Sequence, residues 1–242
     1  MRTFMRLECL FHRIGAEMNG QTRWACRNAL QSLIEIYSIA DRGDLRTEII
    51  KELDRHTGFL ATLDKNPKVD RELLARLLDE IEQLVDGIQE LDGPIGSRLK
   101  SHEFLTQVMN RSGIPGGTCD FDIPALQFWL ARSVADQLKD LSQWAQIFEP
   151  VAKAIEVILR TIRESSKAHK ETADGGIFQK QLDKSLQVQL VRVGIPQEVL
   201  AYPEISGGKF RVSVRFLEQN NLAAKAQQTQ LSIPFELSCC GI

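Results

Sequence analysis

The stretch KFRVSVRF, residues 209–216, alternates apolar side chains with polar or basic ones at every position. A period of two separates the two faces of a β-strand, whereas a helix repeats every 3.6 residues. The apolar face comprises Phe210, Val212, Val214 and Phe216, and the other face comprises Lys209, Arg211, Ser213 and Arg215. The stretch therefore predicts a half-buried strand with one basic face.

Two further stretches of the last third alternate in the same way. Leu186, Val188 and Leu190 alternate with glutamines, and the apolar residues of 231–237 alternate with Ser232, Pro234 and Glu236. Together with residues 209–216 they predict three strands of one antiparallel sheet that packs one face on the core. Because proline cannot donate to a strand ladder, Pro234 predicts an edge strand or a bulge.

The first two thirds of the chain have helical spacing. The first predicted helix carries an apolar stripe of Leu7, Leu10, Phe11, Ile14 and Met18. Further helices are expected over about 22–40, 44–63, from residue 70 to the DGPIG segment, and over about 97–111. Asp44 and Asp70 are suited to accept the free amides of a first helical turn.

The glycines and prolines of SGIPGGTCDFDIP, residues 112–124, interrupt the helical pattern. Short helical turns are expected around ALQFWL and LSQWAQIF, followed by a helix that starts at Pro150 and ends near His169.

The predicted fold class is α+β, with an N-terminal helical domain over 1–171 and a small antiparallel β-sheet domain over 172–242. With 242 residues and 43% hydrophobic composition, the chain can bury a substantial core.

Charge is balanced over the whole chain but unevenly distributed. The 30 Lys+Arg and 32 Asp+Glu residues give a net charge of −2, which argues against general nucleic-acid binding. Residues 64–92 hold four basic and nine acidic residues, whereas 206–217 hold three basic residues and no acidic one. The basic face of the predicted strand is therefore a local feature and does not reflect an excess of positive charge over the whole chain.

Cysteine usage and hydropathy favour a cytoplasmic protein. The five cysteines have no metal-ligand spacing, and an odd number of them suits a reducing compartment. The first residues lack the apolar core of a signal peptide, and no stretch approaches the ~18 apolar residues of a membrane span. We expect a soluble protein without a metal, a cofactor or a membrane partner.

Catalytic motifs are not evident in the sequence. The Gly208-Lys209 pair is followed by Phe210 where a phosphate-binding loop needs a hydroxyl, and no nucleophile elbow occurs. The four histidines are scattered on predicted helices, as surface or half-buried side chains, without ligand spacing. We therefore expect a protein that is not an enzyme. The alternative is an enzyme or binding protein for an anionic metabolite held by Arg211 and Arg215.

The basic residues of the 209–216 strand have two interpretations. Side chains two positions apart on a strand lie about 6.5–7 Å from each other, so the row fits a series of carboxylates or an extended acidic peptide. Arginine suits such a ligand because its planar guanidinium holds a carboxylate through two hydrogen bonds. The other interpretation is a charged strand face that resists aggregation.

Five blocks of the sequence resemble the ZapD family, the Z-ring-associated D proteins of bacterial cell division. These blocks are MRTFMRLECLF, DRGDLRTEIIKELDR, SGIPGGTCDFDIPALQFWL, YPEISGGKFRVSVRF and FELSCC, in the same order over nearly the whole chain. The resemblance implies a cytoplasmic, non-enzymatic homodimer with a helical and a β domain. It also implies a partner, the C-terminal tail of the tubulin-like protein FtsZ, whose filaments are cross-linked and bundled at the mid-cell Z ring.

Family members are expected to bind that tail with a basic surface. The resemblance assigns this role to Arg6, Arg42, Arg46, Lys209, Arg211 and Arg215. Two departures bear on this assignment. Some relatives have basic residues where this chain has Glu103 and Gln127, so we expect a weaker helical part of the site here. Relatives also carry a short strand-like segment before the position of Met1, and a sheet that lacks it is expected to be less stable.

Overall fold

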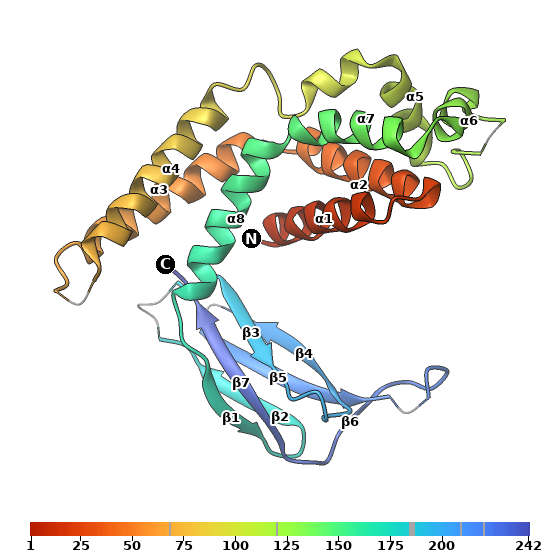
Figure 1. Cartoon of the computed structure of the whole chain (residues 1–242). Helices are drawn as coiled ribbons and strands as arrows, with labels where there is room; N and C mark the ends of the chain where they lie inside the picture. The colour runs from red at the N-terminus through yellow and green to blue at the C-terminus, as the bar shows by residue number, and fades with distance from the viewer. Residues whose placement is uncertain (68, 120, 184–186, 209, 220) are drawn as a thin grey trace. The chain divides into compact units, whose positions relative to one another are not determined.

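The computed structural model divides into two compact units, Arg2–Leu159 and Arg160–Ile242 together with Met1. It describes residues 1–67, 69–119, 121–183, 187–208, 210–219 and 221–242. Helices form the first unit, and strands follow in the second (Figure 1), which confirms the α+β fold class.

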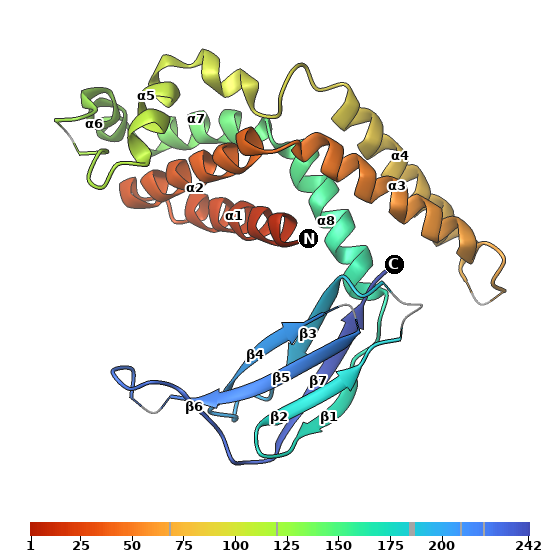
Figure 2. The ribbon, with the colours of Figure 1, turned by 180° about the vertical axis from the view of Figure 1, so that it is seen from behind.

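Eight α-helices and one 3-10 helix are described along the first part of the chain. They are α1 (Arg2–Asn19), α2 (Arg23–Arg42), α3 (Leu45–Leu63), α4 (Arg71–Gln89), η1 (Ser97–Ser101), α5 (Glu103–Ser112), α6 (Pro124–Ala131), α7 (Val134–Gln146) and α8 (Glu149–Glu164). Figures 1 and 2 show α1 beside α2 and α3 beside α4. The last helix, α8, crosses the boundary between the units.

Side-chain caps start four of these helices, and in one of them, α7, the Ser133 hydroxyl accepts a hydrogen bond from the Asp136 amide at 3.1 Å. Thr22 accepts a hydrogen bond from the Ala25 amide at 3.1 Å, and Asp44 accepts one from the Thr47 amide at 3.2 Å. Asp70 accepts from the amides of Glu72 and Leu73 at 3.0 and 3.1 Å. These bonds satisfy amides that have no partner inside the helix, and they confirm the predicted caps Asp44 and Asp70.

The apolar stripe of α1 is confirmed, because Leu7, Leu10 and Ile14 are buried. Other helix predictions need correction. The helix expected over about 97–111 is divided into η1 and α5 at His102, whose backbone is extended at φ −89° and ψ 107°. The helix expected to end near His169 ends at Glu164. There the Ser165 hydroxyl donates to the Ile162 carbonyl at 2.8 Å, a local bond that competes with helix continuation.

The second unit contains two antiparallel sheets, where the sequence predicted one. The strands are β1 (His169–Ala173), β2 (Ile177–Gln181), β3 (Leu190–Gly194), β4 (Tyr202–Gly207), β5 (Arg211–Glu218), β6 (Gln227–Gln228) and β7 (Ile233–Cys240). One sheet has the order β1-β7-β3. The other has the order β2-β5-β4, and β6 also pairs with β5.

The hairpin from β1 to β2 depends on two glycines. Asp174 bridges to Ile177, which leaves Gly175 and Gly176 as a two-residue loop with φ of 59° and 72°. Positive φ at both loop positions is the geometry of a tight hairpin turn, and glycine adopts it without strain. A Cβ at Gly176 would also lie 2.5 Å from the Thr229 carbonyl oxygen. This hairpin was not among the elements predicted from the sequence.

Apolar side chains from both sheets form the core of the second unit. Val212, Val214 and Phe216 of β5 are fully buried together with Phe235 and Leu237 of β7. The Phe235 ring lies 5.3 Å from the Phe216 ring and 5.2 Å from the Phe178 ring, measured between centroids. The alternation of residues 212–216 is thereby confirmed as a strand with one buried face.

Two predictions about the other strands change. Strand β3 begins at Leu190, so the alternation expected from residue 186 does not mark its start; Leu186 itself lies outside the described residues. Strand β7, which contains Pro234, is the central strand of its sheet and not an edge. Pro234 pairs with Thr172 of β1, and pairing with β3 begins only at Glu236. The proline therefore sits where β7 has one neighbouring strand, which tolerates its missing donor.

Candidate protein-binding site

The basic face of β5 is exposed on the side opposite the core. Arg211 and Arg215 are exposed and Ser213 between them is half-buried, while Val212, Val214 and Phe216 are buried. This alternation places both guanidinium groups on one face, as the sequence predicted. We call Arg211, Ser213 and Arg215 the basic row.

Side chains from the two neighbouring strands flank the basic row. The strand register sets Gln181, Gln179 and Ile177 of β2 opposite Arg211, Ser213 and Arg215. On the other side, Ser206 and Glu204 of β4 lie opposite Ser213 and Arg215. Residues directly opposite in an antiparallel pair project from the same face. The basic row is therefore bordered by neutral side chains except at Glu204.

Glu204 forms an ion pair with Arg215. The Arg215 Nη2 atom lies 2.6 Å from Glu204 Oε2, and the two side chains are 51% and 53% exposed. Glu204 was not predicted as a site residue. Its place opposite Arg215 depends on the register between β4 and β5, which the period of two within either strand does not determine. Arg211 has no ion pair among the residues described here.

Two further residues of the predicted strand differ from expectation. Phe210 was expected on the buried face, but β5 begins at Arg211 and the Phe210 side chain is 52% exposed. That interpretation was wrong, because the residue belongs to the turn between β4 and β5. Lys209, the remaining basic residue assigned to this face, lies outside the described residues.

Three candidate arginines belong to the helical unit. Arg6 is exposed on α1, and Arg42 is exposed at the end of α2. Arg46, in the first turn of α3, is half-buried and donates from Nη2 to the Leu91 carbonyl at 2.6 Å and to the Gly93 carbonyl. Arg46 therefore holds the segment after α4, a contact that was not predictable from local sequence pattern.

The carboxylate next to Arg42 is already occupied. Asp41 Oδ1 accepts from Lys100 Nζ at 3.0 Å and from the Tyr37 hydroxyl at 2.9 Å. These hydrogen bonds, that of Lys100 first, lower the pKa of Asp41. The pKa of Lys100 is raised by its hydrogen bonding with Tyr37 and then with Asp41. The negative charge of Asp41 is thus paired with Lys100. Arg42 has no ion-pair partner in the described parts of the chain.

Glu103 and Gln127, where the sequence predicted a weaker helical part of the site, have local partners. Gln127 Oε1 accepts from Arg23 Nη2 at 2.6 Å, and Glu103 Oε1 accepts from Gln107 at 3.2 Å. The next residues along α2 and α6, Trp24 and Phe128, are 68% and 74% exposed. The sequence analysis missed these exposed aromatics, because an apolar run such as ALQFWL gives no indication of which side chains face solvent.

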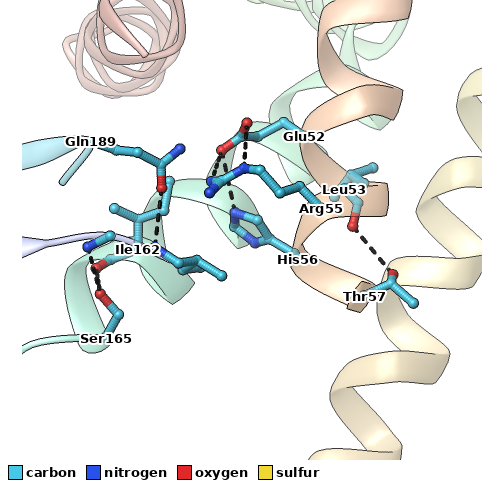
Figure 3. A network of polar contacts seen from close by, with 10 residues as sticks. Glu52, Leu53, Arg55, His56, Thr57, Ile162, Ser165 and Gln189 are labelled. Atoms are coloured by element: carbon cyan, nitrogen blue, oxygen red, sulfur yellow. Dashed lines mark hydrogen bonds and ion pairs between the residues drawn. The ribbon is translucent and has the colours of Figure 1, made fainter. Parts of the chain in front are cut away.

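A polar cluster on α3 comprises Glu52, Arg55 and His56 and includes none of the candidate arginines. Glu52 forms an ion pair with Arg55, and its Oε1 is 3.5 Å from His56 Nε2 (Figure 3). His56 is fully buried, in contrast to the surface or half-buried position expected for the histidines, and neither ring nitrogen has a hydrogen-bond partner among the described atoms. His169 is also not on a helix, because it begins β1.

The described residues contain neither a cluster of metal-ligand side chains nor a helix able to span a membrane. No group of three or more His, Cys, Asp or Glu side chains is arranged to hold a metal ion in the described ranges. Within those ranges, every helix is too short or too polar to span a bilayer. The five cysteines are free thiols, and burial raises the pKa of Cys26, Cys239 and Cys240.

Comparison with known proteins identifies the class of the chain. A family model described as "Cell division protein" matches residues 5–215. A relative named "Cell division protein ZapD" from Methylococcus capsulatus is 39% identical over 240 residues, 99% of this chain and 94% of the relative. Relatives of the same name from Azoarcus sp. and Coxiella burnetii are each 33% identical over 100% of this chain. The matched regions cover 96% and 94% of these relatives, respectively.

The α+β fold and these matches define a cell-division protein. The family matched over most of the chain is ZapD, and the chain belongs to it. The resemblance carried by the five sequence blocks is thereby confirmed.

Proposed function

We propose that this protein binds the C-terminal tail of FtsZ through a basic surface and, as a homodimer, cross-links FtsZ filaments in the cytoplasm at the mid-cell Z ring. The proposal assigns tail binding to Arg211 and Arg215 of the basic row, and also to Lys209, Arg6 and Arg42. Arg46 contributes through its position beside the α2–α3 connection. The family supplies the cell-division role, and the choice of FtsZ rests on the resemblance to ZapD.

One observation carries the proposal: Arg211 and Arg215 project from the same exposed face of a strand whose other face is anchored in the core. Rigid placement reduces the conformational entropy lost on binding. The two Cα atoms are four residues apart, which corresponds to roughly 13 Å along a strand. An extended peptide with carboxylates at a similar spacing matches this row.

Bivalency supplies the affinity that such a surface lacks alone. Exposed ion pairs contribute only about 0–1 kcal/mol each, so a tail held by a few arginines binds weakly to one protomer. A dimer with two equivalent sites, facing a filament with a tail on every subunit, makes the second contact intramolecular. This can raise avidity by about 10² to 10⁴, which is sufficient for bundling.

The site assignment is tested by reversing the charge of the basic row. We expect the double variant Arg211→Glu, Arg215→Glu to lose co-sedimentation with FtsZ filaments while it keeps its circular-dichroism spectrum and its dimer mass. The matched control is Lys170→Glu, Arg192→Glu, which changes the charge equally on exposed positions of the other sheet. Co-sedimentation retained by the first variant, or lost equally by the control, contradicts the assignment.

A metabolite-binding enzyme, the alternative considered from the sequence, has less support. A pocket for a small anion would need to enclose the arginines. One cavity of about 620 Å³ in this unit is instead lined by residues of β1, β7 and the segment after β3, among them Lys170, Ile195, Pro234 and Glu236. Another, of about 520 Å³, is lined by residues between Glu218 and Leu231, without either arginine of the basic row. The basic row lies on a strand face bordered by neutral side chains except at Glu204, which suits an extended peptide better.

A further inference from the structure

We infer that Glu204 occupies the position on Arg215 that a carboxylate of the bound tail would take, so that this residue sets both the strength and the register of tail binding. The inference rests on the proposed function and assigns a specificity-determining residue within the same site. It starts from the single carboxylate that borders the basic row.

The strand register fixes Glu204 beside Arg215. The Gly208 amide donates to the Arg211 carbonyl at 2.9 Å, so residues 208 and 211 form a hydrogen-bonded pair. Because such pairs recur every second residue, Ser206 with Ser213 and Glu204 with Arg215 are hydrogen-bonded pairs as well. The side chains of Glu204 and Arg215 therefore leave the sheet side by side on the outer face, where their charged groups meet at 2.6 Å.

Glu204 is the only charged side chain among the flanking positions described. The six positions opposite the basic row are Ile177, Gln179, Gln181, Glu204, Ser206 and Gly208. The outer face formed by the row and these neighbours therefore carries two positive charges and one negative charge. Neutralising Glu204 raises the net charge of this face from +1 to +2.

The two arginines are consequently unequal toward an acidic ligand. Arg211 faces Gln181 across β2 and has no ion pair among the described residues, so its guanidinium can accept a ligand carboxylate without displacing another. A ligand carboxylate at Arg215 must displace Glu204, which then turns into solvent and loses an exposed ion pair. The tail is thus anchored at Arg211, and its second carboxylate exchanges with Glu204 at Arg215.

The experiment measures the affinity of a labelled FtsZ C-terminal tail peptide by fluorescence anisotropy at low ionic strength. We expect Glu204→Gln to tighten binding by roughly two- to fivefold, the range set by one exposed ion pair. Glu236→Gln, which removes an exposed carboxylate from the other sheet of the same unit, should change affinity less. A gain in affinity cannot arise from unfolding, so the result does not depend on the stability of the variant.

A double-mutant cycle separates displacement from general repulsion. In an Arg215→Gln background the gain from Glu204→Gln should largely vanish, because no ion pair remains to be displaced. An equal gain in both backgrounds, or no gain in the wild-type background, overturns the inference.

If Arg211→Gln and Arg215→Gln themselves leave affinity unchanged, the proposed site fails and the inference fails with it. If both substitutions weaken binding while Glu204→Gln has no effect, the inference alone fails.

Discussion

Two of the candidate arginines have different partners: Arg215 contacts a side-chain carboxylate, and Arg46 contacts main-chain carbonyls. Arg215 meets the exposed carboxylate of Glu204, which a ligand carboxylate can replace with an equivalent bond. Arg46 donates to the main-chain carbonyls of Leu91 and Gly93, which have no comparable replacement within the fold. The first arrangement suits recognition of a partner, and the second stabilises the helical unit.

Substitution of Arg46 should therefore affect folding before it affects binding. We expect Arg46→Ala to lower the free energy of unfolding by about 1–3 kcal/mol, because two carbonyl oxygens lose a charged donor. Arg42→Ala is the matched control, since Arg42 is exposed without a described ion pair and should change stability by less than about 0.5 kcal/mol. Urea-induced unfolding followed by circular dichroism measures both. Equal effects of the two substitutions contradict the structural role given to Arg46.

Several helices of the first unit begin at a residue whose side chain caps the first turn. Asp70 is the clearest case, because one carboxylate oxygen accepts from two amides of the first turn of α4. We expect Asp70→Ala to destabilise the protein by about 1 kcal/mol, the usual value for a lost cap.

Asp79→Ala is the control for the cap, because Asp79 is exposed within the same helix and removes the same charge. Thermal unfolding of both variants should show a lower midpoint for Asp70→Ala only. A midpoint that falls equally in both would attribute the effect to charge and not to the cap.

Strands were predictable from the sequence only where one face is fully buried. Strand β5 alternates because Val212, Val214 and Phe216 all face the other sheet. By contrast, β1 has one buried residue, Ala173, and β4 has five exposed positions of six, so neither carries an apolar period. These strands are held by main-chain pairing, which any sequence without proline at a donor position can form.

The same distinction governs the candidate site. That Arg211 and Arg215 share an outer face follows from the period of two within one strand, so the sequence alone could predict it. The contacts of Glu204 and Arg46 join residues 11 and 45 or more positions apart. Such pairs depend on hairpin register and helix packing, which local pattern does not specify.

For the molecule as a whole, the proposed function combines weak binding of one tail by each protomer with the two equivalent sites of a dimer. The chain carries a net charge of −2, so attraction to an acidic tail has to come from a local surface and not from overall charge. At physiological ionic strength, salt screens most of the interaction between exposed charges more than about 8 Å apart, and this distance shortens as salt rises, so exposed arginines attract an acidic ligand less. Filament bundling should therefore depend both on the tail and on ionic strength.

The most direct measurement is pelleting of FtsZ filaments with this protein across a salt series, using full-length FtsZ and FtsZ without its C-terminal tail. The account predicts bundles with full-length filaments at low salt, progressive loss of bundles as salt increases, and no bundles from tail-less filaments at any salt concentration. Bundling of tail-less filaments at high ionic strength would contradict it.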